Sequence, residues 1–106
     1  MRNKSSKIGT HLYLIQAKTT GHVKIGRSDD PEKRLAQLQT GNPTALRLIL
    51  VAHKKGDLEK HLHRLLGRYH AVGEWFREEC LGSFPIEIWD QRFTWYQEDP
   101  DWWKRD

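Results

Sequence analysis

Residues 11–26 read His-Leu-Tyr-Leu-Ile-Gln-Ala-Lys-Thr-Thr-Gly-His-Val-Lys-Ile-Gly, and this stretch predicts two β-strands joined by a tight turn. Apolar positions recur at every second residue from His11 to Ala17 and again from His22 to Gly26, as on strands that bury a face. Residues 18–21, between the two runs, have the length and composition of a hairpin loop. We therefore expect the fold to begin with a β-hairpin.

The length of this loop also predicts the register of the hairpin. A loop of residues 18–21 pairs Ala17 with His22 and places Tyr13 opposite Gly26. One face then carries an aliphatic set that suits the core, namely Leu12, Leu14, Val23 and Ile25. The other face carries Tyr13, Ile15, Lys24 and Gly26, in which Tyr13 and Lys24 are diagonal neighbours. A loop longer by one residue would reverse this parity.

A helix and a third strand are predicted next. Asp30 can cap a helix that begins at Pro31 and runs to about Gln39. The residues of this helix that we expect to be buried are Leu35 and Leu38. The dense aliphatic run 46–52 predicts a central strand that is buried on both faces.

Residues 57–69 predict a second helix with one apolar stripe. The stripe consists of Leu58, Leu62, Leu65, Leu66 and Tyr69. Glu59 and His63 lie four positions apart at the edge of this stripe, so their side chains would be neighbours. The predicted elements form a small α+β domain with a three-stranded antiparallel sheet flanked by helices.

The chain has 106 residues, which suits one domain. We expect a flexible basic N-terminus over 1–10, a core over 11–77, and an extension over 78–106 packed on or next to the core. The extension is rich in acidic and aromatic residues, among them Trp89, Trp95, Trp102 and Trp103. These aromatics could enlarge the core by ordinary packing, form a homodimer, or bind a protein partner.

Composition narrows the functional classes. The single cysteine, Cys80, excludes an internal disulfide and favours a reducing, cytoplasmic compartment. No apolar run is long enough for a membrane span, and the first 15 residues lack a signal-peptide core. The chain contains no nucleotide-binding glycine loop, no His-Glu-x-x-His motif and no cysteine pair for zinc. A zinc site built from Glu59, His63 and His70 is conceivable.

Charge is distributed unevenly along the chain. The formal net charge is +4. Residues 1–73 hold 14 Lys and Arg against 5 Asp and Glu, a net charge of +9, whereas residues 74–106 hold 4 against 9, a net charge of −5. An excess of this size in the first part favours an anionic partner such as DNA, bound without sequence specificity.

Five short motifs, taken in order, resemble the GIY-YIG nuclease superfamily. They are His11-Leu12-Tyr13, Lys24-Ile25-Gly26, Arg34 on the first helix, Glu59 with His63 on the second, and Gly73-Glu74-Trp75-Phe76. The match is closest to the branch that groups phage and bacterial proteins with the meiotically up-regulated gene family, and it covers about residues 11–77. The resemblance implies a GIY-YIG-like fold and a prokaryotic or phage-encoded protein.

The resemblance also implies an activity and its residues. Members hydrolyse DNA phosphodiesters, so it implies a divalent-metal-dependent DNA endonuclease or nickase of low intrinsic sequence specificity. Glu59 would hold Mg²⁺ or Mn²⁺, since one carboxylate with waters and phosphate oxygens suits magnesium. Arg34 would grip the scissile phosphate. His63 would orient the carboxylate, bind DNA, or serve as an auxiliary acid–base group.

Two roles are open for the pair Tyr13 and Lys24. A phenol is a poor base at neutral pH, but an adjacent Lys24 ammonium would favour the phenolate, and Tyr13 would then deprotonate the attacking water. Alternatively, Lys24 would contact the phosphate and Tyr13 would only position the water.

The remaining motif residues are expected to bind DNA or to stabilise the fold. The predicted DNA contacts are Arg27, Lys33, Lys60 and Arg64. The predicted structural positions are Gly26, Gly73, Glu74, Trp75 and Phe76, the last three joining the C-terminal segment to the sheet.

Two departures from the family pattern keep other functions open. Lys24 replaces the second tyrosine of the best-known members, and Leu38 stands where many active relatives carry a histidine or tyrosine. The chain could therefore be a catalytically weakened nucleic-acid-binding module. It could also be a nuclease that its acidic aromatic extension regulates.

Overall fold

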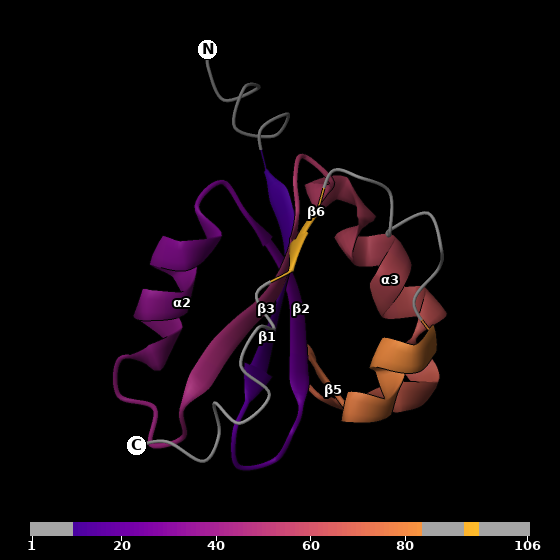
Figure 1. Cartoon of the computed structure of the whole chain (residues 1–106). Helices are drawn as coiled ribbons and strands as arrows, with labels where there is room; N and C mark the ends of the chain where they lie inside the picture. The colour runs from indigo at the N-terminus through magenta and orange to yellow at the C-terminus, as the bar shows by residue number, and fades with distance from the viewer. Residues whose placement is uncertain (1–9, 84–92, 96–106) are drawn as a thin grey trace.

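The computed structural model describes residues 10–83 and 93–95. Its strands form one antiparallel sheet of six strands in the order β4-β5-β2-β1-β3-β6 (Figure 1). In chain order, the elements are β1 (His11–Ala17), β2 (Val23–Ser28), α2 (Pro31–Gln39), β3 (Leu46–Ala52), η1 (Gly56–Leu58), α3 (Glu59–Leu65), η2 (Gly67–Tyr69), β4 (His70–Val72), β5 (Trp75–Phe76), η3 (Glu78–Ser83) and β6 (Phe93–Trp95). The elements labelled η are 3-10 helices.

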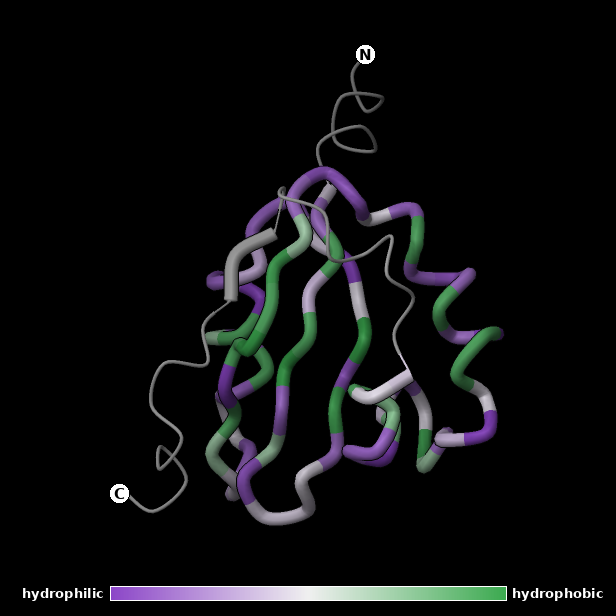
Figure 2. The backbone as a smooth tube through the Cα atoms, turned by 45° about the vertical axis from the view of Figure 1, so that its right-hand side comes forward, coloured by the Kyte–Doolittle hydropathy of each residue, from purple (hydrophilic) through white to green (hydrophobic). Residues whose placement is uncertain are grey.

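The helices cover both faces of the sheet, with α2 on one side and α3 on the other (Figure 1). Two apolar clusters fill the two interfaces. The cluster on the α3 side contains Leu12, Leu14, Val23, Ile25, Leu62 and Phe76, among others. The cluster on the α2 side contains Tyr13, Ile15, Ala17, Leu46, Leu48 and Val51, with Leu35 and Leu38 of α2 packed against it. Figure 2 shows hydrophobic residues along the strands of the sheet.

The predicted hairpin and its register are confirmed. The Ala17 amide donates to the His22 carbonyl over 2.9 Å, and Tyr13 pairs with Gly26. Gly21 closes the loop with a φ of +77°, in the left-handed region that glycine adopts without strain. The second hairpin face, however, is not left to solvent, because α2 covers it and both faces of β1 are buried.

The predicted helix at 31–39 and the strand at 46–52 are also confirmed. The Asp30 carboxylate accepts a hydrogen bond from the Lys33 amide, which caps α2 as its sequence predicts. Along β3 the register shifts opposite Leu14 and Ile15, which pair with Leu50 and Leu48. The unpaired Ile49 forms a β-bulge, so it and its neighbour Leu50 both belong to the cluster on the α3 side.

The prediction of a three-stranded sheet is wrong. Residues 70–76 add β4 and β5 beyond β2, and residues 93–95 of the predicted extension add β6 beyond β3. These strands have two or three residues each, too few for an alternating pattern to be recognised in the sequence. Residues 1–9 of the predicted flexible N-terminus (1–10) and most of the extension, with Trp89, Trp102 and Trp103, lie outside the described residues.

The prediction of one continuous helix over 57–69 is also wrong. The α-helix is confined to Glu59–Leu65, with a 3-10 turn on each side. It ends where Gly67 follows Leu66, whose backbone has left the helical region with φ −101° and ψ +18°. Leu58, Leu62, Leu66 and Tyr69 still pack on the cluster on the α3 side, so the predicted stripe loses only Leu65. Leu62 and Leu66 are buried, whereas Leu65 is 49% exposed.

Among the described residues, no helix has the length and apolar character needed to cross a bilayer.

The split of this helix predicts unequal effects for two neighbouring leucines. Leu62→Ala removes a fully buried side chain and should lower the free energy of unfolding by about 2–5 kcal/mol. Leu65→Ala is the matched control and should change it by less than about 0.5 kcal/mol. Urea unfolding followed by circular dichroism measures both changes. Equal losses of stability would mean that Leu65 is as important to the core as Leu62, as one continuous helix predicts.

Candidate active site

The candidate site lies where β2 continues beyond the end of its neighbouring strand, β5. β5 pairs only with the start of β2, at Val23 and Lys24, and the Ile25 amide donates to the Glu74 carbonyl over 3.3 Å. The Ile25 carbonyl bonds instead to Nε2 of His63, at 2.8 Å. Because a carbonyl only accepts, Nε2 carries the proton and His63 serves to satisfy the open edge of the strand.

Tyr13 is held against the backbone of Gly26. Its side chain is only 2% exposed. A Cβ atom placed on Gly26 would lie 2.5 Å from the Tyr13 hydroxyl and 2.6 Å from its Cζ atom. The glycine of the Lys-Ile-Gly motif is therefore required by the close approach of the phenol across the hairpin, not by a turn.

The phenol of Tyr13 stays protonated well above neutral pH. Burial, the largest effect, raises the pKa of Tyr13 from its ordinary value of 10.0. A hydrogen bond from Arg34 and its positive charge lower this pKa in part, and the carboxylates of Glu74 and Glu59 raise it further. Three charged side chains from three different segments thus act on one phenol.

Lys24 is committed to a carboxylate and does not activate Tyr13. Its side chain is 9% exposed, and its Nζ atom lies 2.6 Å from Oε1 of Glu74. This hydrogen bond, with the charges of Lys24, His63 and Arg34, lowers the pKa of Glu74 against the opposing effect of burial. The interpretation in which Lys24 favours a Tyr13 phenolate is therefore wrong, because Glu74 neutralises the ammonium and burial protects the phenol.

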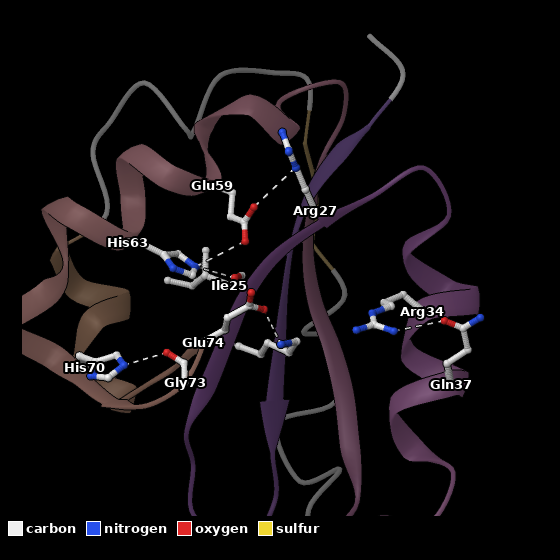
Figure 3. A network of polar contacts seen from close by, with 10 residues as sticks. Ile25, Arg27, Arg34, Gln37, Glu59, His63, His70, Gly73 and Glu74 are labelled. Carbon is white, nitrogen blue, oxygen red and sulfur yellow. Dashed lines mark hydrogen bonds and ion pairs between the residues drawn. The ribbon is translucent and has the colours of Figure 1, made fainter. Parts of the chain in front are cut away.

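Glu59 lies between two weaker partners at the start of α3 (Figure 3). Its Oε1 is 3.6 Å from Nε of Arg27, and its Oε2 is 3.7 Å from Nε2 of His63. Both distances exceed that of a hydrogen bond, so neither oxygen is closely engaged. The side chain is 16% exposed, which leaves it accessible from solvent.

Arg34 reaches the site from α2, on the other side of β2 from Glu59 and Glu74 (Figure 3). Its Nη1 atom donates to Gln37 over 3.3 Å. The structure thus brings together five residues that the sequence predicts for catalysis and metal binding, namely Tyr13, Lys24, Arg34, Glu59 and His63.

Other predicted residues lie around this cluster. Arg27 contacts Glu59, whereas the other three predicted DNA contacts are exposed on the helices: Lys33 on α2, and Lys60 and Arg64 on α3. Gly73 forms the turn between β4 and β5 with a φ of +56°. Trp75 and Phe76 form β5, and Phe76 is buried beside the His63 ring, with ring centroids 5.1 Å apart.

Glu74 has a side-chain contact at the site that the sequence does not predict. Its backbone does join β2, as expected of a structural residue, but its carboxylate points to the site (Figure 3) and binds Lys24. One signal was present in the sequence, because a lysine on a strand between two apolar residues needs a carboxylate when both sheet faces are covered. The partner is 50 positions away, and the sequence does not identify it.

The residues present fit a magnesium ion better than a zinc ion. Among the described residues, no group of three or more His, Cys, Asp or Glu side chains could hold a metal ion together. The conceivable zinc ligand His70 bonds instead to the Gly73 carbonyl over 2.7 Å. A single accessible carboxylate such as Glu59 matches magnesium, which keeps several waters and binds through one or two carboxylates with phosphate oxygens.

Residues 10–97 match the T5orf172 domain. The chain belongs to the T5orf172 domain family. This family is associated with nucleases, and its match includes both the hairpin and β6. No curated protein and no solved structure matches the chain.

The contact between Tyr13 and Gly26 predicts that a single methyl group disturbs the site. Gly26→Ala should lower the free energy of unfolding by about 1–3 kcal/mol, because the buried phenol cannot move away from the new Cβ atom. Gly67→Ala is the control, since a Cβ atom there meets nothing within 4 Å, and its change should stay below about 0.5 kcal/mol. Urea unfolding of both variants tests this, and a neutral Gly26→Ala would contradict the close approach.

The raised pKa of Tyr13 predicts a loss of stability at alkaline pH. The fold favours the neutral phenol, so this contribution is complete below the ordinary value of 10.0 and is lost as the pH rises through the raised pKa. Tyr13→Phe cannot ionise. The stability difference between wild type and Tyr13→Phe should therefore fall above about pH 10, by about 1.4 kcal/mol for each pH unit over which only the unfolded phenol ionises.

Urea unfolding at about pH 8 and about pH 11 measures this difference. The same comparison with Tyr69→Phe, on the α3 side of the sheet, corrects for the loss of a tyrosine. A difference between wild type and Tyr13→Phe that grows with pH would mean that the phenolate is the form that the fold stabilises.

Proposed function

We propose that the protein is a divalent-metal-dependent DNA endonuclease or nickase of the GIY-YIG type. The observation that carries the proposal is that Arg34 from α2, Glu59 from α3 and Glu74 from the β4–β5 turn all act electrostatically on the Tyr13 phenol. A cation, a carboxylate and a hydroxyl around one point are the groups that phosphodiester hydrolysis uses. Membership of a nuclease-associated family supports the same class of reaction.

Tyr13 would position the attacking water rather than deprotonate it. A phenol oxygen has two acceptor positions, and the Arg34 hydrogen bond uses one of them. The other can accept a hydrogen bond from water and hold its oxygen toward the phosphorus. Because the pKa of Tyr13 is raised, the neutral hydroxyl is the form present at physiological pH.

Arg34 would bind the scissile phosphate and stabilise the charge that develops in the transition state. Its side chain reaches the site from α2, where its Nη1 atom donates to Gln37, a contact that a phosphate can replace. A Mg²⁺ ion bound at Glu59 would neutralise phosphate charge and stabilise the leaving oxygen. Hydrolysis then breaks one P–O bond, with water supplying the hydroxyl group to phosphorus and a proton to the leaving oxygen.

Four exposed cations around the cluster would bind the DNA backbone. They are Arg27 on β2, Lys33 on α2, and Lys60 and Arg64 on α3. Contacts of this kind neutralise phosphates without reading bases, so binding should weaken steeply with salt.

A binding module without catalysis is the second candidate, and Leu38 favours it. Leu38 lies one turn beyond Arg34 and packs against the apolar cluster on the α2 side. It therefore contributes no polar group at the position where many active relatives have one.

Cleavage of supercoiled plasmid with Mg²⁺ tests the proposal. Arg34→Ala and Glu59→Ala should each lower the nicking rate by about 10²–10³-fold, the usual effect of removing one group that stabilises transition-state charge. Arg68→Ala and Glu79→Ala remove exposed charges outside the cluster and serve as matched controls that should retain activity.

Two outcomes would contradict the proposal in different ways. Cleavage that both site variants retain would indicate a different site or a contaminating nuclease. Plasmid binding by the wild type without cleavage in Mg²⁺ or Mn²⁺ would favour the binding module.

A further inference from the structure

A hollow opens on the α2 side of the sheet, next to the candidate site. Its volume is about 240 Å³, and the residues that line it include Thr20, His22, Asn42, Leu46, Val72 and Trp75. This is less than the roughly 300–1,000 Å³ of pockets that hold drug-sized ligands, so it suits a small flat group.

The lining combines an aromatic wall with unused polar groups. Trp75 is partly buried and packs against the apolar cluster on the α2 side, while Val72, at the rim, is 64% exposed. Within the part of the chain that the structure describes, neither the His22 ring nor the Nδ2 amide of Asn42 has a hydrogen-bond partner. A stacking surface with free donors and acceptors matches a nucleobase, which has a π face and a polar edge.

The hollow is continuous with the candidate site through Trp75. Trp75 pairs with Lys24 across β5 and β2, and Nζ of Lys24 lies 5.8 Å from the centroid of the Trp75 ring. Along β1, Tyr13 and Ala17 are four residues apart, or about 14 Å on an extended strand. The hollow therefore lies about 14 Å along β1 from a phosphate held at Tyr13, a distance that a few nucleotides of an extended single strand can span.

We propose that this hollow binds an unpaired nucleobase of the strand that carries the scissile phosphate. This inference rests on the proposed function and specifies its substrate class, which is single-stranded or locally unpaired DNA. A base in a regular duplex is stacked and cannot enter such a hollow without leaving the stack. Trp75 is then the residue on which the base stacks.

Fluorescence anisotropy without metal tests the proposal with two oligonucleotides of equal length. One is oligothymidylate, and the other consists of abasic sites and has the same phosphate charge. Wild type should bind oligothymidylate about 10- to 100-fold more tightly, the usual effect of stacking one base on an aromatic side chain. Trp75→Leu should remove most of this ratio and leave the affinity for the abasic chain unchanged.

Two further variants complete the test. Val72→Trp fills the hollow from its exposed rim without altering the core, so it should also remove the preference for oligothymidylate over the abasic chain. It keeps the test decisive if Trp75→Leu does not fold. Tyr69→Leu removes a partly buried aromatic on the α3 side and is the control that should keep the ratio.

Equal affinities of the wild type for the two oligonucleotides would overturn the inference. A ratio that persists in both Trp75→Leu and Val72→Trp would also overturn it, because the base would then bind elsewhere. If the wild type nicks plasmid but binds both oligonucleotides equally, this inference is contradicted and the proposed nuclease function is not. If the wild type prefers oligothymidylate but cleaves DNA with no metal, the proposed nuclease function is contradicted and the nucleobase site is not.

Discussion

The contact of the Tyr13 ring with the backbone of Gly26 is the constraint on which the candidate site depends. It exists only in the register in which Ala17 pairs with His22, because a shift by one residue would turn Tyr13 to the other face of the sheet. The same register places Lys24 on the face that α2 covers and Ile25 on the face that α3 covers. One hairpin loop therefore determines which side chains meet each helix.

The cluster is built from charges that balance one another around a neutral group. Lys24 is buried, and a buried ammonium without a carboxylate would be strongly destabilising, so Glu74 is a structural necessity before it is anything else. The pairing has a chemical consequence. It removes the cation that could have activated Tyr13 and leaves Arg34 as the group that bonds to the phenol. Lys24 therefore contributes little to the exposed positive charge, whereas Lys33, Lys60 and Arg64 are exposed on the helices.

The open edge of β2 explains why side chains from α2 and from α3, on opposite faces of the sheet, can both reach the site. β5 is only two residues long and leaves Gly26 and Arg27 without a neighbouring strand on that side among the described residues. His63 satisfies the Ile25 carbonyl there, and this bond holds the ring near the Glu59 carboxylate. Residues on opposite faces of a sheet are normally separated by it, whereas here the short strand lets Arg34 and Glu59 act on one phenol.

The hairpin with its register, the capped helix α2 and the strand β3 could be predicted from the amino-acid sequence, since each depends on local pattern, loop length and capping. The order of short motifs also selected Tyr13, Arg34 and Glu59 as candidate site residues. The partner of Lys24, the raised pKa of Tyr13 and the six-stranded sheet could be found only in the folded chain, because burial and the pairing of distant residues are not local properties. The division of this segment into η1, α3 and η2 belongs to the same group, because the hydrophobic pattern alone predicts one helix there.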